Sequence, residues 1–254
     1  MASSPYGDLD RPPLRGAALA RALGPDRWRL EVLAQVGSTN EVVAARAREG
    51  EPAGLVVVAE QQTAGRGRLD RTWVSPPRAG LTLSVLLRPE LPAQRWPWLP
   101  LWGGLAVART VREQTGVDAV LKWPNDVLVD GRKLCGLLAE VPVPGVVVLG
   151  IGLNVTTRAD ELPEGGTSLL REGATTTDRD TLLRALLRSL TDVLAEASPD
   201  GYRALCASLG TRVRLALPGG RALEGLAQAV DDAGRLVVDG SPYSAGDVVH
   251  LRGG

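Results

Sequence analysis

The fold is decided by one stretch, residues 118–155, whose sequence is DAVLKWPNDVLVDGRKLCGLLAEVPVPGVVVLGIGLNV. Short apolar runs alternate here with turn residues, which is the pattern of antiparallel strands joined by tight turns. The dipeptide Asp130–Gly131 is typical of a two-residue hairpin loop, and it places Lys133 one step into the returning strand. Pro144–Gly145 predicts a second reversal. We therefore expect a meander of antiparallel strands in this part of the chain.

The segments around this meander predict further strands and helices. Residues 29–35, 54–62 and 80–89 are runs of strand length. A capping box formed by Ser38 and Glu41 predicts the start of a helix that Gly50 ends. Longer helical patterns are expected over residues 96–116, 178–197 and 199–210.

The chain of 254 residues is long enough for one large domain with a small appendage. Residues 1–27 are rich in Pro, Arg and Ala, and we expect them to form a flexible leader in which residues 15–24, RGAALARALG, favour a short helix. Residues 28–209 contain the meander and its flanking elements, which predicts an α+β domain with a mixed or antiparallel sheet flanked by helices. Residues 210–254 change to short β runs with Gly-rich turns, the pattern of a small β-barrel.

The composition argues against several classes of protein. Basic and acidic side chains number 29 each, so the formal net charge is zero and any positive patch for nucleic acid has to be local. Two cysteines are too few for a disulfide framework, and no signal peptide or membrane-spanning apolar run is found, which favours a cytoplasmic protein. The single histidine, His250, disfavours a His-rich zinc site and a Ser-His-Asp triad.

The rarest polar residues are grouped in unusual motifs. Lysine and asparagine together supply only five residues, and all five lie in the segments GSTN, KWPND, GRKLCG and GIGLN. Codon bias towards arginine accounts for the rarity but not for this grouping. We therefore expect these positions to need an ammonium group or a carboxamide that arginine or aspartate cannot replace. They are Asn40, Lys122, Asn125, Lys133 and Asn154.

An arginine-rich loop, QQTAGRGRLDRTWVSP, covers residues 61–76. Gly65 and Gly67 allow the backbone to approach a ligand, and the alternating arginines can converge on a phosphate or carboxylate. The loop is neither a P-loop nor a dinucleotide fingerprint, because no Gly-Lys-Ser/Thr follows. A solvated surface loop and a nucleic-acid-binding arm are the alternatives.

The other motifs complete a set that suits nucleotidyl transfer. GSTN lies where a helix begins and can hold a polar uncharged ligand, although a plain N-cap is the alternative. Asp126 is a candidate Mg²⁺ ligand through water, and Lys133 can neutralise a carboxylate or phosphoryl group. Cys135 is expected to be an inert core thiol. Chemistry of this kind proceeds by positioning and charge stabilisation.

Taken together, the motifs resemble those of the biotin protein ligases. GRGRLDRTWVSP, STN, KWPND, RKLCG and GIGLN match that family's motifs in the family's order, over about residues 30–154. The resemblance implies a catalytic domain of the class II aminoacyl-tRNA synthetase/biotin ligase type over residues 28–209 and an SH3-like barrel over residues 210–254. It also implies two steps: biotin and MgATP form biotinyl-5′-AMP, and a lysine of a biotin carrier domain then displaces AMP. The implied partner is the carrier domain of acetyl-CoA carboxylase or a related acyl-CoA carboxylase.

The resemblance also implies roles for individual residues. Lys133 and Arg68 are the implied catalytic residues, and Asp126 is the implied metal contact. The implied nucleotide-binding residues are Arg68, Arg71, Trp73, Asn125 and Asn154. The implied biotin-binding residues are Ser38, Thr39, Asn40, Gln62, Gly65, Arg66, Gly67, Arg68, Lys133, Gly150 and Gly152.

Three alternatives to a biotin ligase stay open from the sequence. A lipoate or octanoate ligase shares the fold, but its Gly-rich loop usually has a nearby His-Asp, and His250 is far away along the chain. A non-catalytic biotin- or nucleotide-sensing module and a nucleic-acid-binding protein are the others. Some biotin ligases carry an N-terminal winged helix-turn-helix and act as repressors. The short, Pro-rich leader predicts a ligase that does not bind DNA, and the lack of an apolar run of membrane-spanning length predicts that no membrane is a partner.

Overall fold

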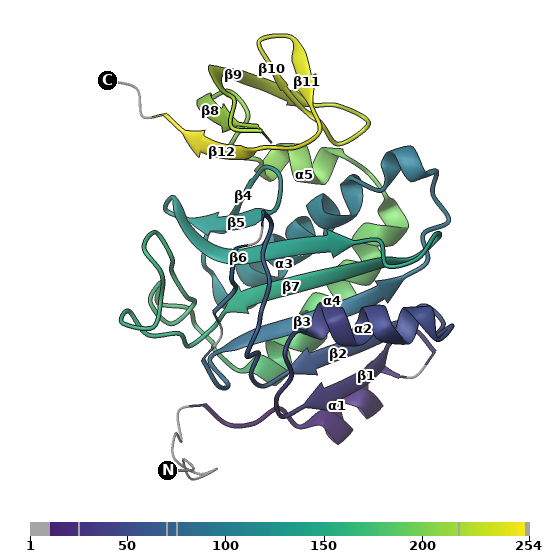
Figure 1. Cartoon of the computed structure of the whole chain (residues 1–254). Coiled ribbons are helices and arrows are strands. Elements are labelled where there is room, and N and C mark those ends of the chain that lie inside the picture. The colour runs from purple at the N-terminus through teal and green to yellow at the C-terminus, as the bar shows by residue number, and fades with distance from the viewer. Residues whose placement is uncertain (1–10, 25, 70, 75, 218, 252–254) are drawn as a thin grey trace.

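The structure is a computed structural model, which describes residues 11–24, 26–69, 71–74, 76–217 and 219–251. Its larger part is a seven-stranded sheet with helices on both faces, and its smaller part is a five-stranded sheet (Figure 1). The predicted fold class is therefore confirmed. No helix among the described residues is long and apolar enough to span a membrane.

The large sheet contains the predicted meander. Its strand order is β1-β2-β3-β7-β6-β5-β4, and every neighbouring pair is antiparallel except β1 and β2. Val129 pairs with Arg132 across the Asp130–Gly131 turn, as the hairpin signal predicts. The strands are β1 (Arg29–Leu33), β2 (Leu55–Ala59), β3 (Gly80–Leu87), β4 (Val120–Lys122), β5 (Asp126–Val129), β6 (Arg132–Glu140) and β7 (Val147–Asn154).

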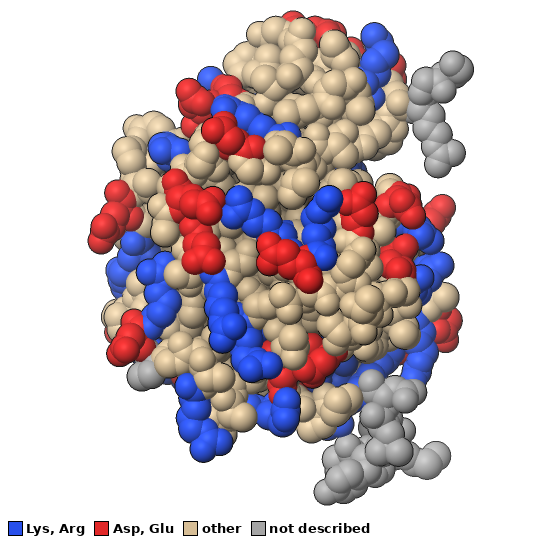
Figure 2. All heavy atoms as spheres, turned by 180° about the vertical axis from the view of Figure 1, so that it is seen from behind, with Lys and Arg blue, Asp and Glu red and all other residues tan. Residues whose placement is uncertain are grey.

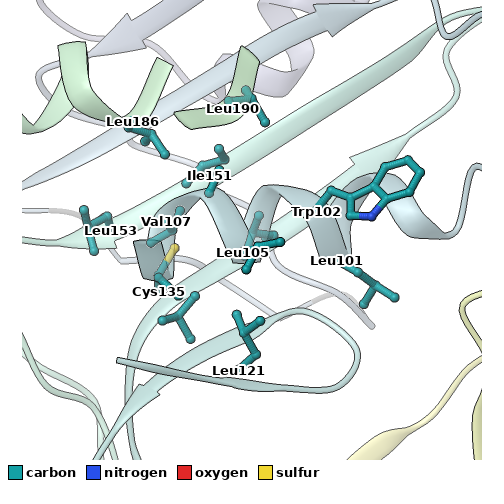
Figure 3. Packing of buried hydrophobic residues seen from close by; sticks show 14 of the residues in the cluster. Leu101, Trp102, Leu105, Val107, Leu121, Cys135, Ile151, Leu153, Leu186 and Leu190 are labelled. Atoms are coloured by element: carbon teal, nitrogen blue, oxygen red, sulfur yellow. The ribbon is translucent and has the colours of Figure 1, made fainter. Parts of the chain in front are cut away.

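Helices bury both faces of this sheet. On one face, α2 (Thr39–Arg48) packs Val43 against Val57 of β2. On the other, α3 (Trp98–Thr115) and α4 (Arg179–Glu196) cover the main core, which Figure 3 shows around Leu105, Ile151 and Leu186. The central strands are buried on both sides, which explains their continuous apolar runs. Three short helices complete the domain: α1 (Gly16–Leu23), η1 (Ala93–Arg95) and α5 (Asp200–Leu205).

The small sheet packs against the end of the large domain where α5 lies (Figure 1). Its order is β11-β10-β9-β8-β12, and all its pairs are antiparallel. Two indoles of the large domain attach to it, since Trp98 Nε1 donates to Asp232 O at 2.9 Å and Trp123 Nε1 donates to Gly234 O at 3.0 Å. The strands are β8 (Arg212–Ala216), β9 (Ala222–Val230), β10 (Leu236–Val238), β11 (Ser241–Tyr243) and β12 (Asp247–His250).

The prediction of a flexible leader is wrong for residues 11–24, and residues 1–10 lie outside the described residues. Leu19 of α1 is only 2% exposed and belongs to the main core. Buried Arg11 donates to Thr156 O at 2.8 Å, and Arg179 donates to Pro12 O at 2.6 Å. The Pro- and Arg-rich composition conceals this packing, because two arginines are buried here by pairing with carboxylates and carbonyls.

Two local predictions also need correction. Ser38 is the N-cap of α2, but its side chain makes no capping hydrogen bond. Instead, Gln62 Oε1 accepts from the backbone nitrogen of Thr39 at 2.8 Å, so a distant loop satisfies this helix end. The helix expected to run to residue 210 ends at Leu205 as α5, because the chain after it turns into the small sheet.

We expect Leu19→Ala to destabilise the whole domain if α1 is part of the fold. Removing a buried leucine side chain costs about 2–3 kcal/mol, which lowers the thermal midpoint by roughly 5–10 °C in a protein of this size. Thermal unfolding followed by circular dichroism measures this. Leu23→Ala, at the half-buried end of the same helix, is the matched control with a smaller expected shift. An unchanged midpoint for Leu19→Ala would mean that α1 is not packed in solution.

Candidate active site

A cavity of about 300 Å³ collects almost all of the predicted site residues. Its walls come from the N-terminus of α2, the arginine-rich loop, the turn before β5, and strands β6 and β7. Two predicted residues, Gly65 and Asn154, do not line it. Those that do are Ser38, Thr39, Asn40, Gln62, Arg66, Gly67, Arg68, Arg71, Trp73, Asn125, Asp126, Lys133, Gly150 and Gly152.

Glycines on β6 and β7 form the floor of the cavity. Gly136 pairs with Gly152 across the two strands, and the indole of Trp73 lies over both. A Cβ atom on Gly152 would come within 2.4 Å of Trp73 Cε2, and one on Gly150 within 2.3 Å of Asn40 Oδ1. The strand glycines therefore provide space for an aromatic ring and a carboxamide, which is the close approach that glycine allows.

A hydrogen-bonded network lies at the α2 end of the cavity. Gln62 Oε1 accepts from the Thr39 hydroxyl at 3.0 Å. Ser84 Oγ lies 2.7 Å from Thr39 Oγ1 and 2.5 Å from Asn40 Oδ1, and Asn40 Nδ2 donates to Glu140 Oε2 at 2.6 Å. These groups can hold a polar, uncharged ligand head, since each is already oriented by a partner.

Sequence analysis missed Ser84 and Glu140. Ser84 is a fully buried polar residue in an otherwise apolar strand apart from Thr82, and Glu140 is the last residue of β6. A serine in a strand that is buried along its whole length needs a hydrogen-bond partner. The position of Ser84 within an apolar run was therefore the sequence signal for a buried polar contact. Glu140 carried no signal in the sequence, because its partners come from α2 and the arginine-rich loop.

Cations and carboxylates meet at the other end of the cavity. Lys133 Nζ lies 2.5 Å from Asp126 Oδ1 and 5.9 Å from the centroid of the Trp73 ring. Arg68 Nη1 donates to Asn125 Oδ1 at 3.3 Å. Burial lowers the pKa of the Arg68 guanidinium, against the opposing effect of Asp126, and the group stays cationic at any physiological pH. This end of the cavity is suited to holding anions.

Lys133 is fixed by the segment that follows β7. Its backbone nitrogen donates to Gly165 O and its carbonyl accepts from Thr167 N, both at 2.8 Å. Asn154 Nδ2 donates to Thr167 O at 2.9 Å. Asn154 is therefore not brought to the cavity with the other predicted residues, and its side chain instead anchors the segment that borders Lys133.

The arginine-rich loop closes on itself over the cavity. Gly67 N donates to Arg71 O at 2.6 Å, and Trp73 N donates to Gly65 O at 2.9 Å. Gly65 serves the loop rather than the cavity, because a Cβ there would lie 2.4 Å from Trp73 O. On its outer side, Arg71 Nη2 lies 2.5 Å from Asp247 Oδ2 of β12. The small sheet thus touches the cavity through Gly246 and Asp247.

We expect Asp247→Asn to weaken ligand binding without weakening the fold. The Arg71–Asp247 pair is solvent-exposed, so it contributes no more than about 1 kcal/mol to stability. Its loss frees the outer side of the loop, and we expect KM for the nucleotide to rise by roughly three- to tenfold, the effect of about 1 kcal/mol. Steady-state kinetics and thermal unfolding measure the two effects. A raised KM together with a large fall in thermal midpoint would contradict this account.

The residues present fit a metal ion that arrives with a nucleotide. Among the described residues, no group of three or more His, Cys, Asp or Glu is placed to hold a metal. Within the part of the chain that the structure describes, Asp126 and Asp247 are the carboxylates that line the cavity. Mg²⁺ commonly binds to one or two carboxylates together with substrate phosphates and water, which matches this donor set.

Cys135 is not part of the cavity chemistry. The thiol is buried in the main core (Figure 3), and that burial raises its pKa. The prediction of a core thiol is confirmed, and a raised pKa disfavours the reactive thiolate.

Comparison with known proteins finds matches over both parts of the chain. Residues 32–155 match the Biotin/lipoate A/B protein ligase family, and residues 208–251 match the Biotin protein ligase C terminal domain. A biotin--[acetyl-CoA-carboxylase] ligase of Mycobacterium tuberculosis is 46% identical over 96% of this chain and 98% of its own length. The bifunctional ligase/repressor BirA of Escherichia coli is 32% identical over 88% of this chain and 74% of its own length. The solved biotin protein ligase of Aquifex aeolicus, in complex with biotin and ATP, is 29% identical with a TM-score of 0.74, covering 89% and 99% of the two chains.

Proposed function

The chain belongs to the biotin protein ligase family, and we propose that it activates biotin with MgATP to biotinyl-5′-AMP and transfers the biotinyl group to a lysine of a carrier domain of acetyl-CoA carboxylase or a related enzyme. Relatives with this carboxylase in their names support the choice of partner. A relative solved with biotin and ATP supports the choice of substrates.

One observation carries the proposal: a single cavity is lined both by the uncharged polar side chains of Thr39, Asn40 and Gln62 and by the cations Lys133 and Arg68. A carboxylate and a triphosphate repel each other, so a reaction between them needs cations at the point where they meet. Lys133 and Arg68 provide two such cations; Lys133 lies against Gly136, which pairs with Gly152, whereas Asn40 lies against Gly150. A molecule with a neutral polar head and a carboxylate tail fits this distribution of charge.

The proposed first step is attack of the biotin carboxylate on the α-phosphate of ATP, with pyrophosphate as leaving group. The network of Ser38, Thr39, Asn40 and Gln62 would bind the ureido head, with Gly150 and Gly152 as the floor. Lys133 would stabilise the charge on the carboxylate and the α-phosphate, and Arg68 would assist it. Arg71, Trp73 and Asn125 would bind the nucleotide, with Asn154 acting through the segment that borders Lys133. Asp126 would hold the Mg²⁺, which reduces the negative charge of the phosphates when bound.

In the proposed second step, the amine of the carrier lysine attacks the acyl carbon of the adenylate and AMP leaves. The adenylate is a reactive anhydride, so it has to be protected from water until the carrier arrives. The loop closed by Gly65, Gly67 and Trp73 lies over the cavity and would give that protection.

The test is to incubate the purified protein with MgATP and biotin, or separately with MgATP and lipoate, and to detect the acyl-adenylate by mass spectrometry. We expect biotinyl-5′-AMP and, when a carrier domain is added, a biotinylated lysine. Detection of lipoyl-adenylate alone would agree with the fold but would overturn biotin as the proposed substrate. No adenylate from folded protein would favour a sensing module.

We further propose that this protein has no DNA-binding repressor role. Figure 2 supports this, because the face it shows carries basic and acidic side chains side by side rather than one sign of charge. Binding to duplex DNA that weakened steeply with salt would contradict the proposal.

A further inference from the structure

Glu140, the last residue of β6, contacts both parts of the site. Its Oε2 accepts from Asn40 Nδ2 at 2.6 Å and from Arg66 Nη2 at 3.2 Å. Its other oxygen, Oε1, lies 3.1 Å from the same Arg66 nitrogen. Asn40 belongs to the buried network under the cavity, whereas Arg66 belongs to the arginine-rich loop above it. One carboxylate therefore adds a link between Asn40 and Arg66 to the contact that Gln62 of the same loop makes with Thr39.

The contact determines which way the Asn40 carboxamide points. A carboxylate only accepts hydrogen bonds, so the amide nitrogen of Asn40 has to face Glu140. Its Oδ1 is then directed at Ser84 and Gly150, where Ser84 Oγ lies at 2.5 Å. Asn40 is 5% exposed, and a reversed carboxamide would place two acceptors together in a buried site.

The contact also holds the arginine-rich loop. Arg66 has a second carboxylate neighbour, Glu41 of α2, but its Nε–Oε1 distance is 3.6 Å and Glu41 is 58% exposed. Glu140 is closer to Arg66 and only 31% exposed, so its charge is screened less by water. If the loop opens, Arg66 moves away from Glu140. The Glu140 carboxylate then has no cation beside it, although it still accepts a hydrogen bond from Asn40.

We propose that Glu140 is a positioning residue that couples binding at the Asn40 end of the cavity to closure of the arginine-rich loop. This inference rests on the proposed function, because it concerns the pocket assigned to biotin and the loop assigned to retention of the adenylate. Coupling of this kind is reciprocal: a ligand that orders the Asn40 network favours the closed loop, and a closed loop favours the ligand. Glu140 itself does not line the cavity.

The test is a mutant cycle with Glu140→Gln and Arg66→Gln, singly and together. We measure KM for biotin, the rate of adenylate formation at saturating biotin, and the share of biotinyl-5′-AMP that escapes into a protein-free filtrate. For Glu140→Gln we expect KM and escape to rise about tenfold, within the usual range of coupling between sites. We expect the rate at saturating biotin to change by less than about threefold, since Lys133 is untouched. The double variant should lose no more adenylate than Arg66→Gln alone.

Glu41→Gln is the matched control, because the Glu41 carboxylate also neighbours Arg66, whereas the Asn40 side chain bonds Glu140 and Ser84 instead. Its KM and escape should stay within about twofold of the parent protein. Two results would overturn the coupling while leaving the ligase function intact. One is a double variant whose adenylate escape equals the sum of the increases in the two single variants. The other is an equal increase in escape for Glu140→Gln and Glu41→Gln. A parent protein that forms no biotinyl-5′-AMP would overturn the proposed function itself, and the coupling with it. Glu140→Asp, which keeps the charge but shortens the reach, provides a second measurement if Glu140→Gln is unstable.

Discussion

Replacing Lys133 with alanine is expected to reduce formation of biotinyl-5′-AMP by roughly 10³-fold while the protein stays folded. Lys133 is the lysine at the cationic end of the cavity, beside Asp126 and against the Trp73 ring. Removing one preorganised group that stabilises developing charge typically costs about 10²–10³ in rate. A further loss is expected because Asp126 would then add an unbalanced negative charge where two anions have to meet. Single-turnover measurement with labelled ATP gives the rate directly.

Two variants test the reason for that loss. Lys122→Ala removes the other lysine of the chain, which lies on β4 outside the cavity, and its rate should stay within about threefold of the parent. Lys133→Arg keeps the charge but replaces a compact ammonium with a planar fork, so we expect only partial recovery. If Lys133→Ala kept more than about a tenth of the rate, the cationic end of the cavity would not act as proposed.

Replacing Gly152 with alanine is the second large effect, and we expect kcat/KM for biotin to fall by about 100-fold. The new Cβ would lie 2.4 Å from Trp73 Cε2 and 2.7 Å from its Nε1, much closer than atoms pack. The indole is carried by a loop, whereas β7 lies in the middle of the sheet between β3 and β6. We therefore expect the loop to move rather than the strand, which disrupts the site while the domain stays folded. Kinetics together with thermal unfolding separate these two outcomes.

Gly37→Ala is the matched control for this change. Gly37 is close to the site in sequence, but a Cβ there would meet nothing nearer than Glu41 Oε2 at 3.8 Å. We expect its kcat/KM to stay within about threefold of the parent. The double variant Gly152→Ala with Trp73→Ala should be no worse than Trp73→Ala alone, because the clash is then removed. If the double variant lost kcat/KM by the sum of the two single effects, the effect of Gly152→Ala would not come from its clash with Trp73.

The sequence alone was sufficient for the central sheet and for most of the site. The Asp130–Gly131 turn and the apolar runs beside it predict the meander, because local backbone geometry and the period of apolar residues are written into neighbouring positions. Of the five grouped lysines and asparagines, Asn40, Asn125 and Lys133 line one cavity, as predicted, whereas Lys122 and Asn154 do not. Their role in ligation stays a proposal until the adenylate is measured.

Only the tertiary structure decided the features whose partners are far apart in the chain. Arg11 is held by Thr156, 145 residues away, and α1 packs on the distant α4 as well as on the neighbouring β1, so a Pro- and Arg-rich composition gave the wrong impression of a flexible leader. Glu140 has no local signal, because Asn40 and Arg66 meet it across separations of 100 and 74 residues. Asn154 belongs to a motif of the site yet faces Thr167. Periodicity encodes which face of a strand is apolar, whereas the packing of separate elements determines which polar groups meet.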